Sequence, residues 1–269
     1  MVKKNFLIAE AGINHNGNIK TALKLVDVAK KNGADAIKFQ TYVTEKRVKK
    51  KYKKIFNILK NCELSFNDFK IIQDYCKQKK IIFFSTPFDI ESVEFLNSLK
   101  VKLFKVASFD IGNFQLINAI LKTKKPTIIS TGMAKLNQID KVYKSYMKKK
   151  VDLTILHCIS SYPNKEESSY LKNIEFFKKR YACKIGISDH TSGIKIPIYA
   201  NLMGAEVIEK HLKLNSNHKC VDAPVSITGN QLRTLKDQLE MNDKILGKIS
   251  FGIKKEEKNT KVFIRSKIL

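Results

Sequence analysis

The sequence predicts an α/β protein folded as a single TIM barrel, the (β/α)8 arrangement. Three observations support this fold class. The chain has 269 residues, close to the roughly 250 that are typical of such barrels. Eight short runs rich in β-branched and aromatic residues recur along it, with helix-length segments between them. No G-x-G-x-x-G follows the first run, so the phosphate loop of a dinucleotide-binding sheet is missing.

Strand and helix candidates alternate along the whole chain. The predicted strands are 6–13, 35–41, 81–87, 103–108, 126–132, 153–160, 184–190 and 207–214. Apolar residues at helical spacing predict a first helix over 19–31, closed by an Asn-Gly C-cap, and a last helix over 229–246. We expect one barrel domain over residues 1–250 and a charged tail over 251–269.

Composition and charge narrow the class of protein. The formal net charge is +26, a field that would attract anionic small substrates. The lysines are spread over nearly every segment and no RNA-binding or zinc-finger motif is present, so we expect no specific nucleic-acid partner. The five cysteines include no C-x-x-C, which argues against a disulfide framework or a zinc ribbon. Without a signal peptide or a long apolar stretch, a soluble cytoplasmic protein with no membrane partner is expected.

Polar side chains gather where the predicted strands end. In a barrel, catalytic groups come from the C-terminal ends of the strands. Residues two apart in a strand share a face, which pairs Lys38 with Gln40, Ser188 with His190, and Glu209 with His211. The other polar residues at these ends are Glu10, Thr86, Lys105, Ser108, Ser130 and Ser160. This set is the main sequence evidence for an enzyme.

Two lysines lie inside otherwise apolar predicted strands, Lys38 in DAIKFQT and Lys105 in LFKVAS. A buried ammonium group is costly unless it meets an anion. One interpretation is internal pairing with a barrel carboxylate such as Glu10 or Glu209. The other is a pocket for a phosphorylated or carboxylated ligand, in which lysines supply charge and hydroxyls supply directional hydrogen bonds. The hydroxyls belong to Thr86, Ser108, Ser130 and Ser188.

Two neighbouring predicted strands each end on a histidine, His190 and His211. Two imidazoles within reach of one point, with Glu10 on the adjacent first strand, suit a divalent metal ion that keeps open positions for water and substrate oxygens. Asp222, in the loop after the last strand, is a further acidic group near that point. The sequence therefore predicts a metal site with the two histidines as ligands. The other histidines are expected to be structural or to lie in loops: His15, His157 and His218.

Eight motifs cover these strand ends: IAEAGINHNG, GADAIKFQTY, FFSTPFD, FKVAS, IISTGM, LHCISSYP, GISDHTSG and GAEVIEKHLKL. In order and spacing they resemble the sialic acid synthase family, over residues 5 to about 246. Members of that family condense phosphoenolpyruvate with an N-acylated amino sugar, N-acetylmannosamine or a related 2-acetamido sugar, to make nonulosonic acids. The resemblance therefore implies a transferase that forms a carbon–carbon bond from phosphoenolpyruvate.

The resemblance also implies a role for each matching position. His190 and His211 look like the ligands of a manganese or magnesium ion. Glu10 is expected to contact the sugar and the water on the metal, and Asp222 to bind the open-chain sugar; these four form the expected catalytic group. The expected phosphoenolpyruvate contacts are Lys38, Thr86, Lys105, Ser108, Ser130 and Ser188. The expected substrate-binding set is completed by Gln40 and Tyr162 on the sugar side and by Ser160 and Glu209.

In the implied reaction, the metal polarises the sugar aldehyde, C3 of phosphoenolpyruvate attacks it, water adds at C2, and phosphate leaves. Three features depart from the family. Ser160 stands where asparagine is common, and CVDAPVS stands where glycine-proline-aspartate-histidine is frequent. The chain also stops at VFIRSKIL, where the family's C-terminal antifreeze-like domain would begin. Because that domain completes the partner subunit's active site, we expect a homodimer or a separate antifreeze-like domain as partner.

Other functions fit parts of the same sequence. A barrel aldolase could use Lys105 or Lys38 to form a Schiff base with a carbonyl substrate. The chain could also be a barrel subunit that is active only with a separate C-terminal domain, or a binding protein without catalytic activity. Borohydride trapping, sensitivity to EDTA, and salt-sensitive nucleic-acid binding distinguish these alternatives.

Overall fold

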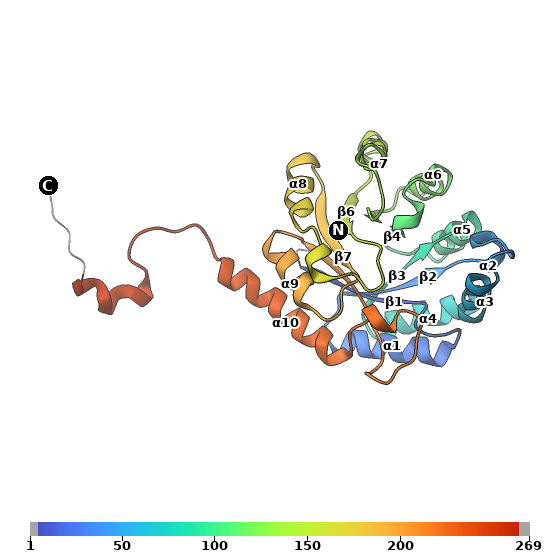
Figure 1. The fold of residues 1–269 in the computed structure, drawn as a ribbon, viewed down its shortest axis with the longest axis horizontal. Coiled ribbons are helices and arrows are strands. Elements are labelled where there is room, and N and C mark those ends of the chain that lie inside the picture. The colour runs from blue at the N-terminus through green and yellow to red at the C-terminus, as the bar shows by residue number, and fades with distance from the viewer. Residues whose placement is uncertain (1–4, 264–269) are drawn as a thin grey trace.

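The computed structural model describes residues 5–263. Its main body is an eight-stranded parallel sheet curved into a barrel, with helices outside (Figure 1). The strands pair in the order β3-β2-β1-β8-β7-β6-β5-β4, and β4 lies against β3, so the two ends of the sheet meet. The strands are β1 (Phe6–Gly12), β2 (Ala36–Thr41), β3 (Ile82–Pro87), β4 (Phe104–Val106), β5 (Thr127–Ser130), β6 (Leu153–Cys158), β7 (Lys184–Asp189) and β8 (Val207–His211). The predicted TIM barrel is confirmed.

Helices connect successive strands and cover the outside of the barrel (Figure 1). They are α1 (Ile19–Lys31), α2 (Thr44–Arg47), α3 (Lys53–Cys62), α4 (Phe66–Gln78), α5 (Ile90–Ser98), α6 (Phe114–Lys122), α7 (Leu136–Lys149), α8 (Lys172–Arg180), α9 (Lys195–Leu202) and α10 (Gly229–Leu246). Short 3-10 turns are η1 (Ser108–Asp110), η2 (Glu166–Ser168), η3 (Ala223–Val225) and η4 (Lys255–Phe263). The first and last of these α-helices have the bounds that the sequence predicts.

Local sequence signals set the helix ends. Asn18 precedes α1, and its side chain accepts a hydrogen bond from a backbone N–H of the first turn, which satisfies a donor that the helix leaves free. Asn32 caps the other end, and Gly33 follows with a φ of +85°, a left-handed conformation that glycine adopts without steric penalty. Ser65 and Asp68 form a reciprocal capping box at the start of α4.

Two apolar layers hold the barrel together, one on each face of the strands. Alternation along β1 shows the division, because Phe6 and Ile8 pack inside the barrel whereas Leu7 and Ala9 pack against the helices. The inner layer consists of Phe6, Ile8, Ala36, Phe84, Leu103, Ile128, Leu156 and Val207. Most of these residues lie at or near the N-terminal ends of their strands, so they fill the lower end of the barrel, opposite the C-terminal strand ends. The inner face at the C-terminal strand ends is left to polar residues.

Several strands end earlier than the sequence predicts. The predicted strand residues that lie beyond the observed strand ends are Ile13, 107–108, 131–132, 159–160, His190 and 212–214. At these points the backbone no longer forms hydrogen bonds with the neighbouring strand and instead bonds to other segments. The carbonyl of His190, for example, accepts a hydrogen bond from the backbone N–H of Asn164 in the loop after β6. The polar residues among them, such as Ser108, Ser160 and His190, therefore stand just beyond the strand ends rather than within the strands.

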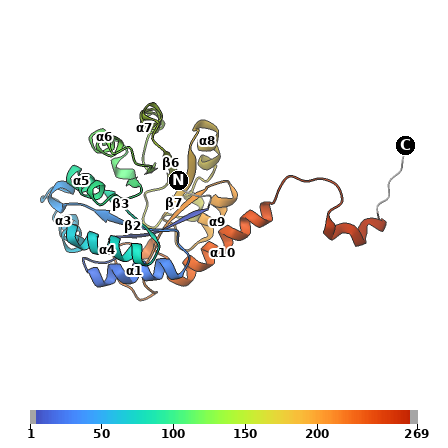
Figure 2. The same ribbon diagram turned by 180° about the vertical axis from the view of Figure 1, so that it is seen from behind.

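Beyond α10 the chain continues away from the barrel (Figures 1 and 2). Large apolar side chains in this part are exposed, among them Ile249, Phe251 and Phe263. The division into a barrel over 1–250 and a tail over 251–269 stays a prediction, and its last residues, 264–269, lie outside the described part. Within residues 5–263, no helix combines the length and apolar character needed to cross a membrane.

Candidate active site

Polar side chains from the strands converge at the C-terminal end of the barrel. They line a solvent-open pocket of about 430 Å³. The predicted residues in its wall are Glu10, Lys38, Gln40, Thr86, Lys105, Ser108, Ser130, Tyr162, Ser188, His190, Glu209 and His211. The other two border it: Ser160 Oγ lies 3.9 Å from Cys158 Sγ, and Asp222 Oδ2 lies 3.4 Å from His211 Nδ1. The structure thus brings the predicted residues together, while their chemical roles stay predictions.

The two strand lysines form ion pairs inside the barrel. Lys38 Nζ lies 2.7 Å from Glu10 Oε2 and 3.7 Å from Glu209 Oε2, and Lys105 Nζ lies 3.5 Å from Glu209 Oε1. Each lysine also donates to a hydroxyl, Lys38 to Thr86 at 3.2 Å and Lys105 to Ser130 at 2.6 Å. Internal pairing is therefore sufficient to explain how these lysines are buried. Binding of an anionic ligand by the same lysines stays a prediction.

The two carboxyl groups of this cluster differ in proton affinity. Burial raises the pKa of Glu10 from its ordinary value of 4.5 to about 7, and the attraction of Lys38 only partly opposes this. Burial acts on Glu209 in the same direction, but Lys105 and Lys38 together outweigh it and hold the pKa of Glu209 below its ordinary value. Glu10 is thus the carboxyl that can carry a proton near neutral pH.

The two predicted metal ligands face one another, with 5.4 Å between the ring centroids of His190 and His211. His190 Nδ1 lies 2.8 Å from the carbonyl oxygen of Ile159. A carbonyl can only accept, so this nitrogen carries a proton. Burial lowers the pKa of His190, but the hydrogen bond and charge of Cys158 outweigh this effect and raise it above its ordinary value. Burial, and then the charges of His190 and Lys38, hold the pKa of His211 well below its ordinary range, which keeps this imidazole neutral, as metal binding requires. Residues 5–263 contain no cluster of three or more metal-ligating side chains.

A small open space lies between the side chains of Glu10, Gln40 and Asp222, beside Gly12. β1 shifts its register between Glu10 and Gly12, and Gly12 has a φ of +52°. A Cβ at Gly12 would lie 3.1 Å from Glu10 Oε1 and 3.5 Å from both Gln40 Nε2 and Asp222 Oδ2. Glycine therefore keeps free the space that these three polar groups surround. Beside it, the ring of Tyr162 packs on His190, with 4.1 Å between centroids.

A sequence profile of the NeuB family matches residues 25–251, which is most of the barrel. The chain belongs to the NeuB family. Among its relatives is the N,N'-diacetyllegionaminic acid synthase of Campylobacter jejuni, 36% identical over 98% of this chain and 84% of the relative. The N-acetylneuraminate-9-phosphate synthase of Mus musculus is 32% identical over 90% of this chain and 71% of the relative.

A solved structure of the same type matches the fold closely. The N-acetylneuraminic acid synthetase of Leptospira borgpetersenii, crystallised with citrate, superposes with a TM-score of 0.92 at 35% identity. The match covers 97% of this chain and 91% of that one. The predictions of this family, of a TIM barrel and of a synthase-type enzyme are thereby confirmed. The assignment of individual site residues is not tested by these matches.

Some pocket residues of this NeuB family member were not predicted. Arg47 donates from Nη1 to Gln40 Oε1 at 3.0 Å and lines the pocket, but its sequence neighbourhood, TEKRVKKKYKK, gives no signal that separates it from surface lysines. Cys158 Sγ lies 3.4 Å from Ser108 Oγ and 3.8 Å from His190 Nδ1. Strand alternation could have identified Cys158, because it stands two residues before Ser160.

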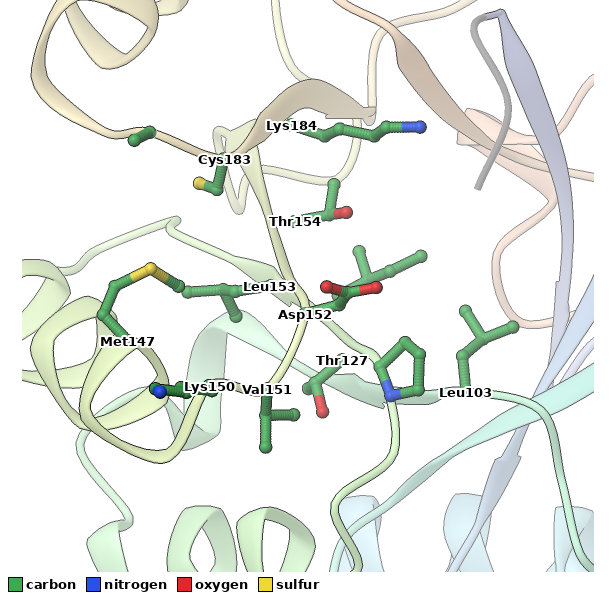
Figure 3. A pocket seen from close by; sticks show the side chains of 13 residues that line it. Leu103, Thr127, Met147, Lys150, Val151, Asp152, Leu153, Thr154, Cys183 and Lys184 are labelled. Atoms are coloured by element: carbon green, nitrogen blue, oxygen red, sulfur yellow. The ribbon is translucent and has the colours of Figure 1, made fainter. Parts of the chain in front are cut away.

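A second pocket, of about 940 Å³, lies at the other end of the barrel (Figure 3). Its wall includes the starts of β5, β6 and β7, with Leu103, Val151 and Leu153 among its apolar side chains. It is larger than the first pocket but contains none of the predicted site residues. Catalytic groups of TIM barrels lie at the C-terminal strand ends, so the smaller pocket is the candidate active site.

Proposed function

We propose that the chain condenses phosphoenolpyruvate with an N-acylated amino sugar and water, releasing phosphate and a nonulosonic acid. The observation that carries this proposal is that one pocket contains both a pair of lysines and a pair of histidines. Two buried lysines with hydroxyl neighbours suit a small polyanion, and two histidines that face one another suit a metal ion. The names of the relatives, which are synthases of legionaminic, pseudaminic and N-acetylneuraminic acid or its phosphate, support the same chemistry.

Lys38 and Lys105 are assigned to the phosphate and carboxylate of phosphoenolpyruvate. Lys105 has no carboxylate oxygen nearer than Glu209 at 3.5 Å among the described ion pairs, and Lys38 is paired at 2.7 Å with Glu10, a carboxyl that can take up a proton near neutral pH. Hydroxyl donors stand nearby to fix the anion's orientation. These are the hydroxyls of Thr86, Ser108, Ser130 and Ser188. The lysines stabilise charge that the substrate already carries, so they should affect binding as well as rate.

Glu10 is assigned to proton transfer, because a pKa of about 7 lets it hold and release a proton near neutral pH. In the proposed reaction, C3 of phosphoenolpyruvate bonds to the aldehyde carbon and the water oxygen bonds to C2. The bond from C2 to the phosphate oxygen then breaks. One proton of the water ends on the new hydroxyl, carried there by Glu10, and the other leaves with phosphate. Gln40, Tyr162 and Asp222 are assigned to the sugar.

His190 and His211 are the residues that would hold a manganese or magnesium ion. The fit rests on the orientation of His190, whose Nδ1 faces the Ile159 carbonyl, and on burial, which keeps His211 neutral. Such an ion, when bound, supplies Lewis-acid polarisation of the sugar aldehyde. With two protein ligands, the remaining positions go to water and substrate oxygens.

Phosphate release tests the proposal. The protein is incubated with phosphoenolpyruvate, manganese and either N-acetylmannosamine or a 2,4-diacetamido sugar, and the reaction is repeated with a separately supplied antifreeze-like domain. Sugar-dependent release of phosphate is expected. If no sugar gives release under either condition, the proposed reaction is wrong.

A Schiff-base aldolase is the second candidate, because burial lowers the pKa of Lys105, as a nucleophilic amine requires. Borohydride reduction in the presence of pyruvate would then leave a covalent adduct on Lys105, detectable by mass spectrometry. Inhibition by EDTA with no trapped adduct would instead favour the metal-dependent synthase.

A further inference from the structure

Arg47 is a cation in the pocket to which the proposed reaction assigns no role. It ends α2, is half-buried, and lines the pocket beside Gln40 and Phe88. Within residues 5–263 its guanidinium makes one side-chain hydrogen bond, to Gln40 Oε1 at 3.0 Å, and no ion pair. A guanidinium has five N–H donors, so most of its donors are available to a ligand.

Two aromatic rings fix the orientation of this guanidinium. Its central carbon lies 3.6 Å from the ring centroid of Phe88 and 4.6 Å from that of Tyr42. Arginine stacks readily on aromatic faces, and a stacked guanidinium loses little further freedom when it binds. Arg47 is therefore held in position before any ligand arrives.

Gln40 connects Arg47 to the space around Gly12. Because Arg47 can only donate, the oxygen of the Gln40 amide must face it, and the NH₂ group must face the other way. That group, Nε2, lies 3.5 Å from where a Cβ of Gly12 would stand, opposite Glu10 and Asp222. Arg47 and Gln40 thus place hydrogen-bond donors side by side, next to the space around Gly12 where the sugar is assigned.

We propose that Arg47 recognises the carbonyl oxygen of an acylamino group on the acceptor sugar. The inference rests on the proposed function. A charged donor fork binds an amide oxygen strongly, and the pocket wall offers Phe88 and Phe109 to the adjoining methyl group.

The test compares acceptors with two, one and no acylamino groups: 2,4-diacetamido-2,4,6-trideoxymannose, N-acetylmannosamine and mannose. For the parent protein, loss of the recognised group should lower kcat/KM by about 10- to 100-fold, as expected for a hydrogen bond to a charged donor. Arg47→Met keeps an apolar stem against Phe88 and removes the donors. It should lower kcat/KM by the same factor for sugars that carry the group, and removal of the group should then have little further effect. The KM for phosphoenolpyruvate should not change.

Two further variants separate recognition from general effects. Arg47→Lys should recover part of the loss, because it keeps the charge without the fork. Lys46→Met removes one charge from the same helix, at an exposed residue paired with Glu91, and should behave as the parent does. If Arg47→Met lowers kcat/KM equally for all three sugars, or raises the KM for phosphoenolpyruvate, the inference is wrong.

The proposed function can fail separately. If the parent releases no phosphate with any sugar, the reaction assignment has failed, and calorimetric titration with the same three sugars decides the role of Arg47. Discrimination between the sugars that disappears in Arg47→Met would support the inference. Equal affinities in the two proteins, or no binding at all, would overturn it.

Discussion

Two buried lysine–carboxylate clusters lie on opposite faces of the barrel sheet. The outer pair consists of Lys210 on β8 and Asp189 on β7, and it faces the helices outside the barrel. The inner cluster faces the pocket and consists of Glu10, Lys38, Lys105 and Glu209. Glu209 and Lys210 are neighbours in the chain, so alternation along one strand sends one residue to each cluster.

The outer pair is complete in itself. Lys210 Nζ lies 2.5 Å from Asp189 Oδ2 and also donates to the carbonyl of Thr191. Asp189 accepts from the backbone N–H and the hydroxyl of Thr191, at 3.1 and 2.9 Å. All of these groups are buried, and the bonds join the loop after β7 to β8. This pair stabilises the fold and faces the helices rather than the pocket.

The inner cluster is incomplete. Within residues 5–263, Glu209 Oε2 makes no hydrogen bond, and His211 Nδ1 makes none although Asp222 Oδ2 lies 3.4 Å away. Burial raises the pKa of Glu10 to about 7, so this carboxyl is about half protonated at pH 7. Unsatisfied buried groups are costly and concentrate at functional sites. The contrast teaches that burial of a lysine does not by itself identify a site. A site is identified by whether the groups around the lysine can still form hydrogen bonds or ion pairs with a ligand.

The largest expected effect is on stability. Lys210→Met leaves Asp189 charged and buried, which should cost about 3–5 kcal/mol of the free energy of unfolding. Lys38→Met should cost less, because Glu10 can take up a proton when it loses its partner. Urea unfolding followed by circular dichroism measures both. Equal costs for the two variants would remove the distinction between the clusters.

Glu10→Gln should lower kcat by about 10²- to 10³-fold, since it removes the proton carrier but keeps the shape of the side chain. It should not raise the KM for phosphoenolpyruvate, because it takes a competing carboxylate away from Lys38. Steady-state kinetics under the phosphate-release conditions separate the two constants. A raised KM with unchanged kcat would show that Glu10 binds substrate rather than transferring a proton.

Lys38→Met should raise the KM for phosphoenolpyruvate by about 10- to 100-fold, the loss expected for a charge-assisted hydrogen bond. Lys79 offers a matched control, because it is an exposed lysine paired with Asp27 on the surface. Lys79→Met should leave this constant unchanged. Unchanged affinity in Lys38→Met would mean that this lysine serves only to pair with Glu10 and Glu209.

The smallest expected effect is a pH dependence of stability. Burial raises the pKa of Glu10 from 4.5 to about 7, so between these values the folded chain keeps a proton that the unfolded chain has lost. This contribution therefore destabilises the fold as pH rises, by about 1 kcal/mol per pH unit. Glu10→Gln removes it, so the stability of the variant relative to the parent should increase from pH 5 to pH 7. Urea unfolding at several pH values measures the difference in stability between the variant and the parent. A difference that does not change with pH would show that Glu10 is ionised throughout this range.

Repeating patterns made the fold predictable. Alternation and helical spacing located the eight strands and gave the bounds of α1 and α10, because burial imposes these periods directly on the sequence. The same alternation put Lys38, Glu209 and His211 on the inner face. It could not show that Lys105 pairs with Glu209 across the barrel, since the strands that carry them are not adjacent. Arg47 also escaped prediction, because it enters the pocket from a lysine-rich connection whose sequence shows no period.

The inner apolar layer below the cluster has a consequence for the order of events. It closes the lower end of the barrel, so both substrates must enter and leave through the same mouth. Gln40 stands two residues nearer that mouth than Lys38 along β2, so the roles proposed for these two residues would make the sugar the outer occupant and phosphoenolpyruvate the inner one. A bound sugar would then block access to the deeper position. The proposed reaction is therefore an ordered one, with phosphoenolpyruvate first to bind and the sugar second.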